Sequence, residues 1–420
     1  MESTLEYIWQ RLPLILLFAS GYMVYRVLVV SDLTGALVRA VLRRSGGGLM
    51  RMLLYIMSMA AFLSFFMPNT VAVLALLPIV RALERDLGGV TSGVAARPPI
   101  WLTTALMLAL IYGANIGGMG SLIGSPANLM LIGWLDVFEV AGREQVTYGS
   151  WFIWSIPLVT VFGACAWGMI VLFGLPRHAI WRDDYVAVIP PREPLDRAQR
   201  VATVLSVLFT LFWICESAAR GRMQQHHSAL SFAALFFTVL FLGACFVWRS
   251  VGYGARRRPL LRLRDLVADV PRRGLFFVAA FVAIIVAVRL LALDSFAVGR
   301  VEGLFSPEMK PLLLYLVLVL AVIILTEVFS NTLVSATFFP TVYVLAESAE
   351  LSPLEPMLAV SLASTCAFMT PIATPCNALA YGEMRGVSLR RMMLLGLALN
   401  LIGAVLISTW LRLIIPLVYS

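Results

Sequence analysis

Two asparagine–threonine pairs lie inside apolar stretches of the sequence, where polar side chains are uncommon. The pairs are Asn69-Thr70, in the stretch SFFMPNTVAVLALLPIV, and Asn331-Thr332, in the stretch TEVFSNTLVSATFFPTV. Asparagine and threonine supply neutral hydrogen-bond donors and acceptors without the cost of burying a formal charge. Together with nearby backbone groups, such pairs could bind a small ion. A single pair could equally be a helix cap or a polar packing contact.

Downstream of each pair, a second motif contains residues that interrupt helices. It reads GSPAN at Gly124–Asn128 and ATPCN at Ala373–Asn377. The first copy belongs to the stretch GANIGGMGSLIGSPANLMLIG, which holds six glycines, a proline and two asparagines. These are poor residues for an uninterrupted membrane helix. Because both motifs recur in the same order, we infer an internal repeat.

A broken helix in a membrane has a specific chemical use. Where a helix ends at membrane depth, its terminal N–H and C=O groups lack partners, and such backbone is tolerated only beside a cavity or inside protein. Free N–H groups at a helix N-terminus attract anions, and unwound carbonyls coordinate sodium. Duplicated halves with broken hydrophobic segments are typical of secondary transporters. The repeat therefore predicts two half-sites that together form one binding site.

Two hydroxyl side chains stand close to the repeated pairs. Ser64 and Thr326 each lie one helical turn before the motif of their half, so each shares a helix face with it. We expect both to be cation ligands, together with backbone carbonyls near Gly124 and Ala373. The asparagine–threonine pairs would then contact the substrate.

The elements that must position these residues are membrane helices. Of the 420 residues, 60% are hydrophobic and only 13% are charged, whereas a soluble domain is about 25% charged. Uncharged runs of membrane length recur without the alternation of barrel strands, so we predict an all-α polytopic membrane protein. The net charge of +9 does not indicate nucleic-acid binding, because the arginines concentrate in short connections. The densest of these, Arg249–Arg273, is expected to be a cytoplasmic loop.

The order of apolar segments and motifs predicts five regions. They are N-terminal scaffold helices at 1–48, a first-repeat transport region with a hairpin and a broken helix at 49–176, scaffold helices with the arginine-rich loop at 177–310, a second-repeat transport region with a hairpin and a broken helix at 311–388, and a C-terminal helix at 389–420. Several apolar segments are too short to cross about 30 Å at about 1.5 Å per residue, which predicts half-helices and re-entrant hairpins.

At these motifs the chain resembles the divalent anion:sodium symporter (DASS) family of the ion transporter superfamily. That family carries two Ser-Asn-Thr motifs at hairpin tips, each followed by a loop of the type Thr-Pro-Pro-Asn. Ser330-Asn331-Thr332 is an intact copy, FMTPIATPCNALAYG resembles the partner loop, and the likeness extends from about Val30 to the C-terminus. The resemblance implies about eleven transmembrane helices with two re-entrant helical hairpins, in an inverted-repeat, elevator-type homodimer.

The resemblance also implies a substrate, a coupled ion and their ligands. The expected activity is symport of sodium (Na+) with a small divalent anion, either sulfate or a di- or tricarboxylate such as succinate, malate or citrate. The implied substrate-binding residues are Asn69, Thr70, Asn331, Thr332 and Pro375. The implied sodium ligands are Ser64, Asn69 and Gly124 in one site and Thr326, Ser330, Asn331 and Ala373 in the other.

Departures from the family pattern keep other transporters open. Pro68 replaces the first motif serine, which removes a hydroxyl and an N–H, and Ala127 and Cys376 each replace a proline. An anion exchanger that does not use sodium is therefore an alternative. The segment GANIGG also resembles the arsenite-permease and sodium/proton antiporter branches of the ion transporter superfamily. An antiporter would need a membrane-embedded carboxylate as its proton site, and Glu327 is the candidate; the other interpretation of Glu327 is a structural partner to a nearby donor.

The motifs that the sequence lacks favour a transporter over an enzyme. It has no Walker motif, no glycine-rich nucleotide fingerprint and no nucleophile–base constellation. We expect ion or substrate gradients to drive transport. The expected partners are a small anionic substrate, sodium ions, the lipid bilayer and a second copy of the chain, with no nucleic acid. The expected location is the cell membrane, which in a bacterium is the inner membrane.

Overall fold

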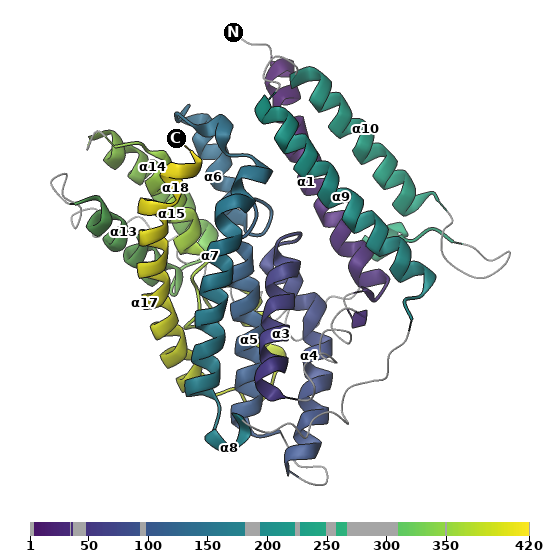
Figure 1. Ribbon diagram of the computed structural model, residues 1–420, viewed down its shortest axis with the longest axis vertical. Coiled ribbons are helices and arrows are strands. Elements are labelled where there is room, and N and C mark those ends of the chain that lie inside the picture. Colours follow the sequence, from purple (N-terminus) through teal and green to yellow (C-terminus); the bar gives the residue numbers. More distant parts are fainter. Residues whose placement is uncertain are drawn as a thin grey trace.

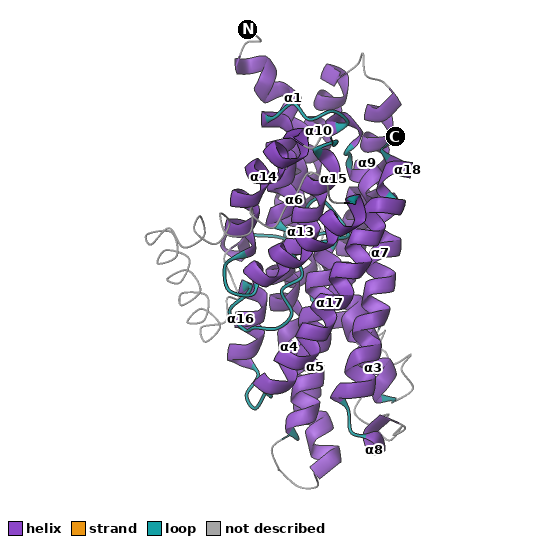
Figure 2. Cartoon of the chain, turned by 90° about the vertical axis from the view of Figure 1, so that its left-hand side faces the viewer, coloured by secondary structure: helices purple, strands orange, loops and turns teal. Residues whose placement is uncertain are grey.

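A computed structural model describes most of the chain. It covers residues 4–33, 35–36, 48–92, 98–180, 194–222, 227–248, 258–266, 310–348 and 351–419. The apolar segment 274–293 lies outside these residues, as does the arginine-rich segment 249–273 apart from 258–266. Within the described residues the regular structure is helical and contains no β-strand (Figures 1 and 2).

The helices follow the apolar segments of the sequence. In the first part of the chain they are α1 (Thr4–Val30), α3 (Leu49–Ser64), α4 (Asn69–Ser92), α5 (Ile100–Gly118), α6 (Pro126–Val137), α7 (Tyr148–Met169), α8 (Arg177–Ile180), α9 (Arg197–Arg222) and α10 (His227–Phe246). In the second part they are α13 (Pro311–Thr326), α14 (Asn331–Ser348), α15 (Leu354–Ser364), α16 (Pro375–Glu383), α17 (Leu389–Leu413) and α18 (Ile415–Val418).

The length and apolarity of these helices identify a multi-pass membrane protein. Among the described residues, five helical stretches are long and apolar enough to cross a membrane: Ile100–Gly118, Tyr148–Gly174, Arg197–Glu216, Ser228–Phe246 and Leu389–Val418. Inside the protein, 89% of the first stretch is buried, against 28–39% of the other four. Helix α5 is therefore the central helix, whereas the others keep an exposed apolar face of the kind that contacts lipid.

Three further apolar helices are shorter than a membrane is thick. Helices α3 and α13 each have 16 residues, and α15 has 11. At about 1.5 Å per residue they reach roughly 24 Å and 17 Å, less than the ~30 Å of a hydrocarbon core. The backbone groups at their ends must therefore find partners within the protein.

The two sequence repeats pack in matching ways. Helices α3 and α4 contact α5, and helices α13 and α14 contact α15. The second piece of each broken helix then crosses to the other repeat, because α6 contacts α14 and α16 contacts α4. An ion pair joins the repeats at one such contact, where Arg81 of α4 lies 2.6 Å from Glu383 of α16. Neither repeat is therefore a self-contained unit.

Helices α1, α9 and α10 form a separate group beside this body. Helix α1 contacts both α9 and α10, and α9 also contacts α7 (Figure 1). None of the residues around the cavity described below comes from these three helices.

The first unwound segment, residues 119–125 between α5 and α6, is closed by an asparagine. The side-chain amide of Asn128 donates to the carbonyls of Gly118, at 2.9 Å, and Ser121, at 2.7 Å. Its side-chain oxygen accepts from the hydroxyl of Ser361 on α15, at 2.8 Å. One side chain thus satisfies unwound carbonyls and also joins the two repeats.

The second unwound segment, residues 365–374 between α15 and α16, is closed in the same way. The amide of Asn377 donates to the carbonyls of Ala367, at 2.8 Å, and Thr370, at 2.9 Å. Its oxygen accepts from Asn115 on α5, at 3.2 Å. The correspondence of Asn128 and Asn377 explains why the second motif of both repeats ends in asparagine.

Glycines allow α5 to lie directly against α3. A Cβ atom added at Gly117 would lie 2.4 Å from the Cα and carbonyl oxygen of Ala61, and one at Gly113 would lie 2.4 Å from the carbonyl oxygen of Met57. Small residues at four-residue spacing are a common means of close helix packing in membranes. The glycines at positions 113 and 117 therefore serve helix packing, whereas the glycines that follow them lie where the helix is interrupted.

We predict that Gly117→Ala destabilises the protein by about 1–3 kcal/mol, because the added methyl group meets backbone that cannot move aside. The matched control is Gly163→Ala in α7, where an added Cβ has no atom within 4 Å. The measurement is the unfolding temperature of each purified variant in the same detergent. Equal unfolding temperatures for the two variants would contradict the packing described here.

Candidate functional site

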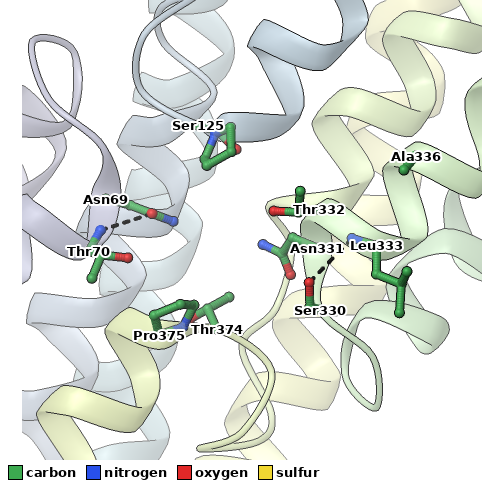
Figure 3. A pocket seen from close by; sticks show the side chains of 11 residues that line it. Asn69, Thr70, Ser125, Ser330, Asn331, Thr332, Leu333, Ala336, Thr374 and Pro375 are labelled. Atoms are coloured by element: carbon green, nitrogen blue, oxygen red, sulfur yellow. Dashed lines mark hydrogen bonds between the residues drawn. The ribbon is translucent and has the colours of Figure 1, made fainter. Parts of the chain in front are cut away.

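A cavity of about 420 Å³ lies between the two repeats. Its walls come from α4, α6, α14 and α16 and from the residues that precede them. The lining residues are Asn69, Thr70, Ser125, Pro126, Ser330, Asn331, Thr332, Leu333, Ala336, Thr374 and Pro375. Figure 3 shows Asn69 and Thr70 on one side of the cavity and Ser330, Asn331 and Thr332 on the other.

Four helices begin at this cavity. Helix α4 starts at Asn69, α6 at Pro126, α14 at Asn331 and α16 at Pro375, and all four residues line the wall. The N-terminus of a helix carries unpaired N–H groups and roughly half an elementary positive charge. None of the lining residues has a charged side chain. The electrostatic character of the cavity is therefore set by backbone dipoles and neutral side chains, an arrangement that suits an anion.

The first half of the cavity is held by hydrogen bonds that Asn69 makes inside the protein. Its backbone N–H donates to the carbonyl of Gly124, at 3.1 Å, and its side-chain amide donates to Asn115, at 2.8 Å. Its side-chain oxygen accepts from the N–H of Thr70, at 2.9 Å. The hydrogen-bonding groups of Asn69 are thus largely engaged within the protein. The other polar side chains at the cavity in this half are those of Thr70 and Ser125.

The second half of the cavity presents more unused polar groups. The Ser330 hydroxyl accepts from the N–H of Leu333, at 3.2 Å. The side-chain oxygen of Asn331 is buried and has no hydrogen-bond partner among the described residues. A buried unpaired oxygen is costly and indicates a site that a ligand completes.

Behind the first half of the cavity, carbonyl groups converge near Gly124. A Cβ atom added at Gly124 would lie 2.6 Å from the carbonyl oxygen of Ser64 and 2.7 Å from that of Gly118. These two carbonyls belong to the last residues of α3 and α5, where the helix dipole is negative. The Ser64 hydroxyl is fully buried and has no partner within the described part of the chain. This cluster of oxygens fits a small hard cation such as sodium.

The corresponding residues of the second half are also buried. Thr326, the last residue of α13, and Ala373 have no exposed surface. The Thr326 hydroxyl donates to the carbonyl of Ile323, at 2.9 Å, so its oxygen lone pairs remain available to a cation.

The residues selected from the sequence therefore divide into two sets. Those expected to contact the substrate all line the cavity: Asn69, Thr70, Asn331, Thr332 and Pro375. Among the expected sodium ligands, Asn69, Ser330 and Asn331 also line it, whereas Ser64, Gly124, Thr326 and Ala373 do not.

Asn115 is the residue that sequence reasoning missed. Its oxygen accepts from the amide of Asn69, and its amide donates to Asn377 and to the carbonyl of Ala367, so it joins the first pair to the second unwound segment. It also accepts from the thiol of Cys376, at 3.0 Å. The signal in the sequence was an asparagine within an apolar run, where a polar side chain needs hydrogen-bond partners; in the structure it is fully buried in α5.

Ser125 and Thr374 are two further residues that were not singled out. Each is the N-cap of the helix that follows: Ser125 accepts from the N–H of Ala127, at 3.3 Å, and Thr374 accepts from that of Asn377, at 3.1 Å. Both line the cavity. Their matching positions in the two repeats, followed in each case by proline, were the available signal.

Comparison with known proteins adds an independent observation. The family model described as "Citrate transporter" (CitMHS) matches residues 5–306. A sodium-dependent dicarboxylate transporter of Staphylococcus saprophyticus is 24% identical over 418 residues, which covers 96% of this chain and 76% of that protein. A protein of the same description from Staphylococcus aureus strain bovine RF122 is 25% identical over 418 residues, with 96% and 77% covered.

The unequal bonding of the two asparagines leads to a stability prediction. Asn69→Ala should lower the free energy of unfolding by about 1–3 kcal/mol, because it leaves buried partners unpaired. Asn331→Ala should cost less than about 1 kcal/mol, because the buried oxygen that it removes has no partner. The two variants serve as each other's control in a thermal unfolding experiment without added ligand. Equal losses would show that the two half-sites do not differ as described.

Proposed function

Because the chain belongs to the citrate transporter family, we propose that it is a secondary active transporter of small di- or tricarboxylate anions, coupled to sodium. The observation that carries this proposal is the convergence of four helix N-termini and two asparagine–threonine pairs on one cavity without a charged side chain. Such a site can stabilise negative charge on several oxygens at once, because the positive ends of four helix dipoles lie on different sides of it.

The substrate would bind across the two repeats. We assign one carboxylate to Asn69 and Thr70 and another to Asn331 and Thr332, with Pro375 in the wall between them. The cavity volume of about 420 Å³ lies in the lower part of the range for small-molecule sites. A cavity of this size accommodates succinate and malate, and the relatives described as dicarboxylate transporters support that class.

Sodium would bind behind the substrate in each half. The first site would use Ser64, Asn69 and Gly124, and the second would use Thr326, Ser330, Asn331 and Ala373. The converging carbonyls near Gly124 and the unpaired Ser64 hydroxyl support the first site despite the proline at position 68. The relatives described as sodium-dependent support sodium as the coupled ion.

The proposed mechanism assigns a role to four of the five predicted regions. Residues 49–176 and 311–388 would form a transport part, in which α3–α4 and α13–α14 are re-entrant pairs. Residues 1–48 and 177–310 would form a scaffold, which includes the separate group α1, α9 and α10 (Figure 1). The whole chain would have about eleven membrane spans and act as a homodimer, with the transport part moving as an elevator. In a bacterium it would lie in the inner membrane.

Uptake into proteoliposomes tests the function. We expect an inward sodium gradient to drive accumulation of radiolabelled succinate, and we expect replacement of external sodium by choline to stop it. Asn331→Ala and Thr332→Ala should each reduce uptake about tenfold or more, because each removes hydrogen bonds to a charged ligand. The matched control is Thr337→Ala on the same helix, since Thr337 does not line the cavity.

Three outcomes of that experiment would contradict the proposal. Uptake that is unchanged in choline would indicate proton coupling or exchange, and uptake that requires succinate inside the vesicles would identify an exchanger. Accumulation of arsenite or sulfate without any succinate uptake would refute the substrate class.

A cation-site variant tests the coupling separately. Thr326→Ala should raise the sodium concentration for half-maximal uptake about fivefold, because one lost ligand is worth about 1 kcal/mol and 1.4 kcal/mol is tenfold. Thr326→Ser keeps the hydroxyl and is the control. An unchanged sodium dependence in Thr326→Ala would exclude Thr326 from the site.

A further inference from the structure

Glu327 is a buried carboxylate that the proposed transport cycle does not use. It follows the last residue of α13 and is 5% exposed. It does not line the cavity. The sequence left two interpretations, a proton site or a structural partner. The hydrogen bonds around this side chain distinguish between them.

Four N–H donors converge on the Glu327 carboxylate. The backbone N–H groups of Phe368 and Met369 donate to Oε1, at 2.7 and 2.8 Å, and that of Thr370 donates to Oε2, at 2.9 Å. The side-chain amide of Asn400 on α17 also donates to Oε1, at 2.7 Å. The side chain acts only as an acceptor in these four contacts, and this is the bonding pattern of an ionised carboxylate.

In the first repeat, the corresponding backbone N–H groups have acceptors other than a carboxylate. Phe65 stands at the position that corresponds to Glu327, and Met119 and Gly120 correspond to Phe368 and Met369. Here the N–H of Met119 donates to the carbonyl of Ile116, at 3.1 Å, and that of Gly120 donates to the carbonyl of Gly117, at 2.8 Å. These amides find their acceptors in the last turn of α5, and a Cβ atom added at Gly120 would collide with the ring of Phe65, the residue in place of Glu327. In the second segment the corresponding amides donate to Glu327.

The neighbouring contact is the same in both repeats. The Ser121 hydroxyl donates to the backbone carbonyl of Phe65, at 2.7 Å, and the Thr370 hydroxyl donates to that of Glu327, at 2.8 Å. At this turn, the difference between the repeats is the acceptor of the turn amides. In one repeat the acceptor is backbone, and in the other it is a side chain.

Helix α17 packs tightly against the segment that Glu327 holds. A Cβ atom added at Gly396 would lie 2.5 Å from the carbonyl oxygen of Phe368 and 2.6 Å from the Cα of Met369. Asn400, one turn further along α17, reaches the carboxylate. Glu327 therefore joins the end of α13, the unwound segment and α17 at one point.

We propose that Glu327 is a positioning residue for the second half-site and not a proton carrier. Its four hydrogen bonds fix the turn at Phe368–Thr370, and this turn sets the course of the chain through Ala373 to Thr374 and Pro375, which line the cavity. The inference rests on the proposed function in so far as those three residues act in binding. Without the carboxylate, only a fraction of molecules would hold the segment in the binding conformation, and the apparent dissociation constant would rise by the inverse of that fraction.

Amide hydrogen exchange of the purified protein, followed by mass spectrometry, tests the proposal without any transport assay. Glu327→Gln keeps the length of the side chain but turns one acceptor into a donor that faces other donors. We expect exchange in peptides that cover 366–370 to be at least about tenfold faster than in the unchanged protein. Peptides that cover 119–125 should exchange at the same rate in both, because the first segment uses backbone acceptors.

The matched control is Glu355→Gln. Glu355 also accepts a hydrogen bond, from the Tyr315 hydroxyl, but it lies in the first turn of α15, at the opposite end of that helix from the unwound segment. Its replacement should leave exchange at 366–370 unchanged. If Glu327→Gln does not fold, Glu327→Asp replaces it, because the shorter carboxylate keeps an acceptor but cannot reach all four donors, and a smaller acceleration is then expected.

Binding of succinate in the presence of sodium, measured by calorimetry on the same samples, supplies the second readout. We expect the apparent dissociation constant to rise about tenfold or more in Glu327→Gln, with helical content and elution volume retained. Unchanged exchange at 366–370 would overturn the proposal. So would a variant that keeps its exchange protection and succinate affinity and loses only proton-driven uptake. If the unchanged protein fails to bind succinate, the proposed function fails, while the exchange comparison still decides the role of Glu327.

Discussion

The need of backbone N–H groups at helix starts for hydrogen-bond acceptors is the constraint on which this structure depends. Four helices, α4, α6, α14 and α16, begin around one cavity inside a membrane protein. An N–H group without a partner costs several kcal/mol where water is excluded, so these helix starts need polar side chains or a ligand. The asparagines, serines and threonines at the cavity satisfy part of that need, and an anion would satisfy the rest.

The two repeats share a topology but differ in how they meet this constraint. Asn128 and Asn377 close the two unwound segments with equivalent bonds, and α6 and α16 cross to the opposite repeat in equivalent ways. The side-chain oxygen of Asn69 is nevertheless engaged, whereas that of Asn331 has no partner among the described residues. The two repeats therefore form a two-sided cavity whose sides are chemically unequal.

A binding site without charged side chains favours release of the substrate, and a transporter must release its substrate as well as bind it. Charge-assisted bonds from arginine to a carboxylate are strong, and they strengthen further where the dielectric constant is low. Backbone dipoles and neutral amides provide attraction from several directions with a shallower energy minimum. The charged side chain nearest in sequence to the second asparagine–threonine pair is Glu327. Its carboxylate accepts from the backbone N–H groups of Phe368 and Thr370 and does not line the cavity.

The sequence by itself determined that this is a helical membrane protein with a duplicated motif pair, because long uncharged runs require helices and because polar residues and glycines stand out within them. The sequence was also sufficient to select Asn69 and Asn331 as candidate site residues and to locate the two unwound segments. Only the tertiary structure decided which of their polar groups are already occupied, that Asn115 links the two halves, and that Glu327 accepts four donors. The physical reason is that these partners come from distant parts of the chain, and a residue's type limits the bonds that it can form without determining which group will face it.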